Sequence, residues 1–162
     1  MGECHISPLM IHLPILNSSP IDATLFLSST VANASVIGPQ PGGHFRVAAI
    51  TRRGAIDVVL DHLPVDSKLV LNAHTSLSPA TVQLHEAYEG RFVVTTTFDK
   101  PDIFVDRNKK DPARENRERF VEMKRVGMEG SMGDVRWGEE KEGSTKGTVH
   151  IESSFAPVRL RL

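Results

Sequence analysis

Small residues or prolines stand two places before a Val or Ile at seven positions along the chain. The seven units lie at residues 34–36, 54–56, 80–82, 101–103, 133–135, 147–149 and 156–158. In six of them, another apolar residue follows two places after the Val or Ile. A chain-breaking residue followed by alternating apolar and polar positions is typical of a turn that leads into a β-strand. The pattern predicts repeated strand–turn units and an all-β fold.

Apolar runs that end in Ser or Thr form a second pattern. They begin at residues 24, 46, 68 and 91, so successive runs start 22 or 23 residues apart. A constant spacing in this range favours a stacked architecture, in which each unit needs its neighbours to bury its apolar face. We therefore predict a β-solenoid-like stack of strand–turn units. An antiparallel β-sandwich is the alternative, because its strands and turns also recur at short intervals.

The last three of the seven units depart from this spacing. They begin at residues 133, 147 and 156, which are 14 and 9 residues apart. Such short separations favour a closing hairpin or a cap over further units of the stack. Apolar and basic residues alternate from residue 158 to residue 162, so we also expect a packed terminal strand.

The length of 162 residues fits one domain with a substantial core. Residues 1–22 contain three prolines and a polar cluster, and we predict that they form an extended N-terminal arm. Residues 23–162 are predicted to form a single β-rich domain. A charged insert interrupts this domain at about residues 106–127.

The structure of the charged insert is left open by its sequence. Phe120, Met123 and Val126 follow the i, i+3 spacing of a helix. A strand over residues 119–128, preceded by a flexible segment, explains the same residues equally well.

Composition and charge exclude several classes of protein. The chain has 40% apolar residues, a formal net charge of −1 and a single cysteine, Cys4, so it is not strongly basic and cannot form an internal disulfide. The apolar N-terminal stretch is interrupted by prolines and lacks a preceding basic residue, so we expect no signal peptide and a cytoplasmic location. No apolar segment approaches the length of a transmembrane helix.

Two C-terminal segments carry a resemblance to a known family: VRWG at residues 135–138 and GTVHIESSFAPVRL at residues 147–160. With the preceding repeats, they resemble an uncharacterised fungal family, found mainly in basidiomycetes, that is known only as a domain of unknown function. More distantly, the chain resembles adhesin-like β-solenoid repeats. The Asn-Gly turns of that family are absent from this sequence. The resemblance implies a β-solenoid fold and no catalytic residues.

The sequence lacks the motifs of common catalytic and metal sites, including the nucleophile elbow, the P-loop and paired zinc-binding cysteines. His62, His74 and His85 fall 11 or 12 residues apart, and Asp61 or Glu86 could complete a metal site with them in a stacked fold. Solvent-facing loop positions explain these residues as well. We therefore predict no metal, no cofactor and no catalytic residue.

The candidate binding residues are Trp137, Arg114, Arg117 and Arg119. Trp137 could stack on a sugar or anchor a partner, although its place in an alternating segment favours the core. The three arginines lie in residues 107–125, which carry a net charge of +4. Glutamates interleave with these basic residues and favour a self-compensating surface, so we do not expect nucleic-acid binding.

We predict a non-catalytic β-repeat scaffold that binds a protein or a surface ligand such as a glycan, or that associates with itself through exposed strand edges. Two alternatives stay open: a carbohydrate-active β-solenoid enzyme, and a module that binds an anionic ligand with the basic insert. An enzyme needs a cleft with convergent carboxylates or histidines. A scaffold needs an open strand edge or a flat apolar face.

Overall fold

The computed structural model describes the backbone of residues 9–14, 21–26 and 32–37, and the backbone and side chains of residues 43–139 and 147–162. These residues contain strands and no helix, which confirms the all-β prediction. No helix in the described part of the chain is long and apolar enough to cross a membrane. The strands are β1 (Leu9–Pro14), β2 (Ile21–Phe26), β3 (Ala32–Ile37), β4 (Gly43–Thr51), β5 (Ile56–Val59), β6 (Ser67–Thr75), β7 (Ala80–Gln83), β8 (Gly90–Thr96), β9 (Asp102–Phe104), β10 (Arg119–Val126), β11 (Gly130–Trp137), β12 (Gly147–Ser153) and β13 (Val158–Arg161).

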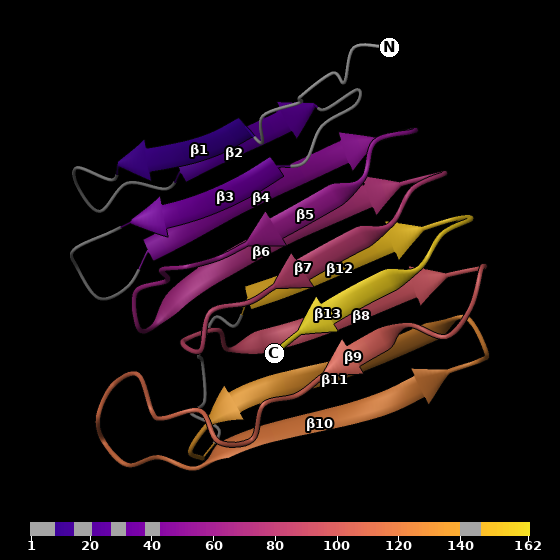
Figure 1. The fold of residues 1–162 in the computed structure, drawn as a ribbon. Coiled ribbons are helices and arrows are strands. Elements are labelled where there is room, and N and C mark those ends of the chain that lie inside the picture. The colour runs from indigo at the N-terminus through magenta and orange to yellow at the C-terminus, as the bar shows by residue number, and fades with distance from the viewer. Residues whose placement is uncertain (1–8, 15–20, 27–31, 38–42, 140–146) are drawn as a thin grey trace.

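The strands form two facing layers (Figure 1). One layer is a seven-stranded sheet in the order β10-β11-β8-β12-β6-β4-β2. The other contains a four-stranded sheet in the order β5-β7-β13-β9, and the two-stranded sheet β1-β3 continues it because β3 contacts β5. The chain crosses from one layer to the other between most consecutive strands. The hydrophobic core lies between the layers.

Alternation along each strand decides which side chains enter this core. In β6, Leu69, Leu71 and Ala73 are buried, and the residues between them are partly or fully exposed. In β13, Val158 and Leu160 are buried and the intervening arginine is exposed. Burial of each Leu or Val side chain contributes about 1.5–3 kcal/mol to folding. The period-two pattern in the sequence therefore marks the inner face of each strand.

Parallel pairing with an offset of 23 or 24 residues relates the consecutive units from β1 to β7. Ile21 pairs with Phe45, and Ile56 pairs with Ala80, so each partner lies 24 residues further along the chain. The same offset relates β4 to β6. Antiparallel pairing occurs between β10 and β11 and between β11 and β8, so the seven-stranded sheet is mixed, and the sheets are not closed. The predicted β-solenoid is therefore not confirmed, and neither is the wholly antiparallel sandwich.

The prediction of a closing hairpin or cap is wrong for β12 and β13. Strand β12 lies between β6 and β8, and β13 lies between β7 and β9, with parallel pairing on both sides of each. Of the last three sequence units, only 133–135 belongs to a hairpin, β10–β11. The last two strands of the chain are therefore inserted between units that are consecutive in sequence.

Buried hydroxyl groups align at the ends of four neighbouring strands. Thr51 pairs with Thr75, Thr75 with Ser153, and Ser153 with Thr96. We call these four residues the hydroxyl ladder. All four are buried, and each stands where its strand ends and the chain turns toward the other layer. Among the described residues, those hydroxyl residues that end the apolar runs beginning at 46, 68 and 91 therefore occupy equivalent corners.

The hydroxyl ladder ties successive turns together. Thr75 Oγ1 donates a hydrogen bond to the carbonyl oxygen of Gly54 at 3.1 Å, and Thr96 Oγ1 donates to that of Ala156 at 2.9 Å. Ser153 Oγ makes the same kind of bond, 3.1 Å long, to a carbonyl oxygen of the turn after β6. A buried carbonyl group needs such a partner, because leaving it without one costs about 1–3 kcal/mol.

The charged insert contains a strand and no helix. Residues 106–118 form a loop with turns, and β10 then pairs antiparallel with β11. Of the two structures left open for this segment, the strand is the one observed. Much of the predicted N-terminal arm, including residues 1–8 and 15–20, lies outside the described residues. The division at residue 22 stays a prediction.

Candidate binding groove

A groove lies where the seven-stranded sheet extends past the edge of the four-stranded sheet. Strand β9 is the last strand of the smaller sheet, whereas the larger sheet continues to β11 and β10 (Figure 1). The groove has a volume of about 700 Å³. It is lined by Ile103, Val105, Asp106, Arg107, Lys109, Arg117, Glu118, Arg119, Phe120, Val121, Met123 and Trp137. Among the described strands, none covers the inner face of β10.

Strand β9 presents a free edge to this groove. Among the described strands, β9 pairs with β13 only. The Phe104 carbonyl accepts a hydrogen bond from Leu162 N, and Asp106 N donates to the Leu162 carbonyl. In a parallel ladder, alternate residues bond to the same neighbour. The backbone N–H and C=O groups of Ile103 and Val105 therefore face away from β13, toward the open side.

Arg119 lies inside the groove with its charge incompletely compensated. Its Cζ lies 5.8 Å from the centre of the Trp137 ring, and its Nη1 donates to the Asp106 carbonyl oxygen at 2.9 Å. Its Nε is buried and has no hydrogen-bond partner among the described residues. Burial lowers the pKa of Arg119, because a partly desolvated cation is less stable than a hydrated one.

Lys109 is a second half-buried cation in the same groove. Its Nζ makes one long contact, 3.5 Å, to the carbonyl oxygen of Leu84. Burial lowers the pKa of Lys109, and the nearby positive charge of Arg119 lowers it further. Two neighbouring cations that both lose hydration form a site that would gain from an anionic group.

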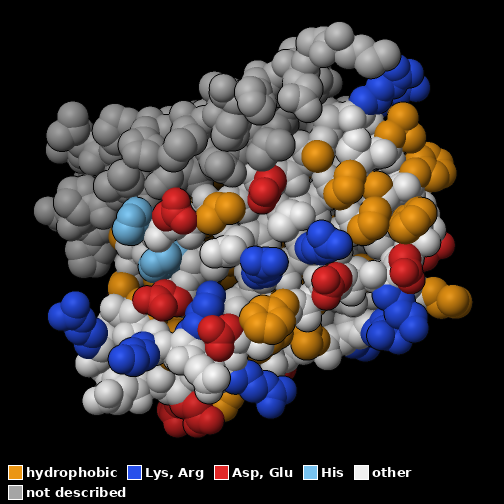
Figure 2. Space-filling view, in the orientation of Figure 1, with side chains coloured by type: hydrophobic (Ala, Val, Ile, Leu, Met, Phe, Trp, Pro, Cys, Tyr) orange, Lys and Arg blue, Asp and Glu red, His pale blue; other side chains and the backbone are white. Residues whose placement is uncertain are grey.

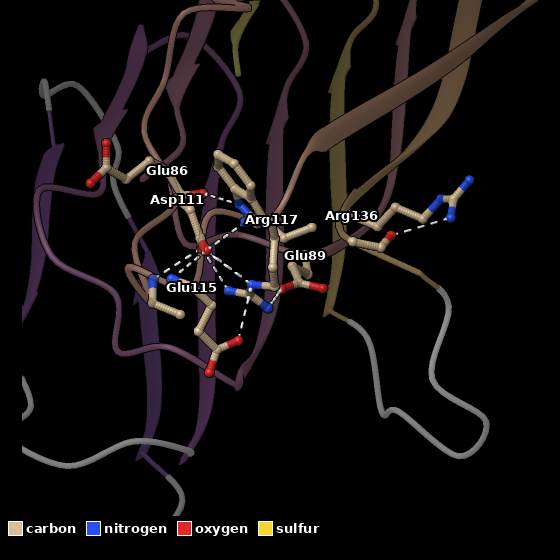
Figure 3. A network of polar contacts seen from close by, with 9 residues as sticks. Glu86, Glu89, Asp111, Glu115, Arg117 and Arg136 are labelled. Atoms are coloured by element: carbon tan, nitrogen blue, oxygen red, sulfur yellow. Dashed lines mark hydrogen bonds and ion pairs between the residues drawn. The ribbon is translucent and has the colours of Figure 1, made fainter.

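Arg117 has a different role from Arg119. Its guanidinium group forms ion pairs with Asp111 at 2.9 Å and with Glu89 and Glu115 at 3.5 Å each (Figure 3). The Asp111 carboxylate also accepts hydrogen bonds from backbone N–H groups, including those of Ala113 and Glu115. Arg117 and Asp111 therefore hold the 106–118 loop in shape, and the charge of Arg117 is compensated within the protein.

The network of Asp111 and Arg117 should make the stability of the fold depend on pH in the acidic range. The hydrogen bond from Arg117 holds the pKa of Asp111 well below its usual range. Because the folded pKa is lower than the unfolded value of about 3.9, Asp111 stabilises the fold above that pH, and its contribution is lost as the pH falls further. We expect the stability difference between the parent protein and Asp111→Asn to shrink below about pH 4. Urea unfolding of the parent protein and Asp111→Asn between pH 7 and pH 2.5 measures this stability difference, and Asp61→Asn is the control. A stability difference between the parent protein and Asp111→Asn that did not change with pH would contradict the prediction.

The sequence-based candidates fall into three environments. Arg119 and Trp137 lie together in the groove, and Arg117 also lines the groove but is held in the loop network. Arg114 is exposed and does not line the groove. Trp137 is 4% exposed, and its Nε1 donates to the Glu86 carbonyl oxygen at 2.9 Å, so its ring faces do not offer a surface for stacking a sugar. Whether these residues bind a ligand stays a prediction.

The three histidines do not come together. The ring centres of His62 and His85 lie 6.4 Å apart, and burial lowers the pKa of His85. His74 lies elsewhere, on β6, with its Nδ1 3.4 Å from a carboxylate oxygen of Glu152. Within the described ranges, no group of three or more His, Cys, Asp or Glu side chains is placed to hold a metal ion.

Sequence reasoning missed Lys109 and the free edge of β9. Lys109 belongs to a run of charged residues, and nothing in that run distinguishes it from its exposed neighbour Lys110. The alternation of Ile103 and Val105 indicates a strand, but not which side of that strand is paired. Both features depend on contacts between segments that are distant in sequence.

Comparison of the chain with protein-family models, with curated proteins and with solved structures found no match. The resemblance to the fungal family and the cytoplasmic location therefore stay predictions.

Proposed function

We propose that this chain is a non-catalytic scaffold, built on solenoid-like stacking of its strand–turn units, that binds an extended acidic segment of another protein along the free edge of β9. The observation that carries the proposal is this edge, which lies above the uncovered inner face of β10 and beside two incompletely compensated cations. The parallel pairing at a 24-residue offset supports the stacking.

An extended peptide matches the hydrogen-bonding groups of the groove. A strand laid beside β9 would exchange backbone hydrogen bonds with Ile103 and Val105, as in β-strand addition. Its alternate side chains would then face β10, where Val121 is partly buried and Met123 is 54% exposed. Main-chain bonds supply affinity in this mode of recognition, and the side-chain positions supply selectivity.

The charges favour an acidic partner. Arg107, Lys109 and Arg119 line the groove with Asp106 and Glu118, and the Glu86 carboxylate also acts on Lys109 and Arg119. Burial nevertheless lowers the pKa of both Lys109 and Arg119, so these two cations stay incompletely stabilised. A carboxylate near Lys109 and Arg119 would restore the electrostatic stabilisation that these side chains lose on burial. It would also offer an acceptor to the buried Nε of Arg119. Charge complementarity of this kind increases the association rate and rejects basic segments.

A peptide library displayed on phage and selected on the full chain tests the proposal. We expect the selected peptides to alternate apolar and polar residues and to carry an acidic residue. In a synthetic copy, N-methylation of the amides that face β9 should weaken binding more than tenfold, whereas N-methylation of the intervening amides should not. Failure to select a binder, or equal effects of the two methylation patterns, would overturn the proposal.

Substitutions in the groove provide the matching test on the protein side. We expect Arg119→Gln and Lys109→Gln each to weaken peptide binding about tenfold, which corresponds to about 1.4 kcal/mol. Arg114→Gln is the matched control, because Arg114 belongs to the same basic segment but does not line the groove. Circular dichroism checks that the variants remain folded. An equal loss of binding in the control would contradict the location of the site.

A further inference from the structure

Exposed apolar side chains form a column at the corner that carries the hydroxyl ladder. Because Thr75, Ser153 and Thr96 are in register, the residues two places after them occupy equivalent positions on adjacent turns. These residues are Leu77, Phe155 and Phe98, which are 49%, 66% and 61% exposed. We call this column the apolar ridge. Apolar side chains gather along the same edge of the molecule in Figure 2.

The apolar ridge is held in place by its backbone. Leu77 N donates to the Arg52 carbonyl oxygen at 3.0 Å, and Phe155 N donates to that of Ser76 at 2.9 Å. Adjacent strands lie about 4.8 Å apart, so the ridge repeats at that spacing. A preformed surface loses little conformational entropy on docking. Large exposed apolar side chains that are contiguous in this way mark a site of association.

The two ends of the apolar ridge differ in charge. Arg52 and Arg53 lie on the turn next to that of Leu77, and both are exposed. At the other end, Asp99 follows Phe98, and the Glu129 carbonyl accepts a hydrogen bond from Thr96 N. Lys100 follows Asp99 at this second end, and Arg125 lies on the hairpin that carries Glu129. A two-fold axis would bring the turn with Arg53 in one copy onto the turn with Glu129 in another.

We propose that the apolar ridge is a homodimer interface in which a second copy of this chain docks in the opposite direction. Phe155 lies near the two-fold axis, Leu77 of one copy faces Phe98 of the other, and Arg53 faces Glu129. The interface uses turns between the layers, whereas the groove lies beyond β9, so each copy in the dimer keeps its groove open to solvent. With few apolar side chains, the interface falls at the small end of the size range, and we expect dissociation constants of about 10–100 μM.

Sedimentation equilibrium of the full chain over a range of concentrations tests this proposal. We expect a monomer–dimer equilibrium that is lost in the double variant Phe98→Ser/Phe155→Ser. Phe104→Ser is the matched control, because Phe104 is also 61% exposed but lies on β9. A monomer at every concentration, a dimer that survives the double variant, or equal loss in the control would overturn the proposal. Recovery of a different protein on the ridge without dimerisation would overturn it too.

A charge exchange tests the direction of docking. We expect Arg53→Glu to weaken the dimer and the added change Glu129→Arg to restore it, because the two positions face each other across the axis. Circular dichroism verifies folding, which these exposed positions should not disturb. If the dimer of the doubly substituted protein is weaker than the dimer of Arg53→Glu alone, the proposed opposite direction of docking is wrong.

Discussion

Gly90→Ala is expected to destabilise the fold by more than about 3 kcal/mol or to prevent folding. Gly90 has φ of 148°, a conformation that residues with a Cβ rarely adopt. It pairs with Gly147 at the point where β12 enters between β6 and β8, and a Cβ on Gly90 would overlap the Gly147 carbonyl group. In the alanine variant, the clash between the new Cβ and the Gly147 backbone would therefore add to the strain of the positive φ. Urea unfolding followed by circular dichroism measures the loss of stability.

Gly127→Ala is the control for this prediction. Gly127 also has a positive φ, 66°, but a Cβ there would meet no atom within 4 Å. It should therefore show the cost of strain alone, about 1–2 kcal/mol. If Gly90→Ala were no more destabilising than Gly127→Ala, the close insertion of β12 beside β8 would be wrong.

The two patterns in the sequence correspond to the two layers, except that units 133–135 and 147–149 lie in β11 and β12 of the seven-stranded sheet. The units that begin with a small residue or proline at 54, 80, 101 and 156 lead into the strands of the four-stranded sheet. The apolar runs that end in Ser or Thr form strands of the seven-stranded sheet. The reason is local, because alternation fixes the buried face and the hydroxyl residue supports the turn. Local rules of this kind can be read from one sequence.

The order of the strands could not be read in the same way. The runs beginning at 68 and 91 suggest adjacent units, yet β12 separates β6 from β8. The spacing along the chain predicts where each strand–turn unit begins, but it does not predict which strand pairs with it in the sheet. The insertion depends on Gly90 and Gly147, which are 57 residues apart and let two backbones approach closely. Such a pairing is set by packing between segments that are distant in sequence, and the periodicity of the sequence does not predict it.

The candidate groove was predicted in part, for a related reason. Arg117 and Arg119 look equivalent in sequence, but Arg117 is compensated by Asp111, Glu89 and Glu115, whereas Arg119 lies against Trp137. Residue type therefore identified the charged segment. Only the fold separated Arg117, which is paired with carboxylates, from Arg119, whose buried Nε has no partner among the described residues. The free edge of β9 results from the order of the strands, so it could not be predicted before that order was known.

Trp137→Ala is the second substitution with a large expected effect. Removing a buried aromatic side chain costs about 3–5 kcal/mol, and the Glu86 carbonyl would also lose the hydrogen bond from Nε1. Trp137→Phe keeps most of the buried area and loses the hydrogen bond, so we expect a smaller cost of about 1–2 kcal/mol. Because Trp137 is the single tryptophan, unfolding must be followed by circular dichroism in these variants.

The comparison of these two variants separates a core role for Trp137 from a binding role. If the indole acts by packing beneath Arg119, Trp137→Phe should stay folded and bind the selected acidic peptides within about threefold of the parent affinity, since a phenyl ring still supports the guanidinium group. A direct contact between indole and ligand predicts instead a tenfold or greater loss of binding, about 1.4 kcal/mol, in a variant that circular dichroism shows to be folded. The 4% exposure of Trp137 favours the first result, and titration of the peptide into both proteins decides between them.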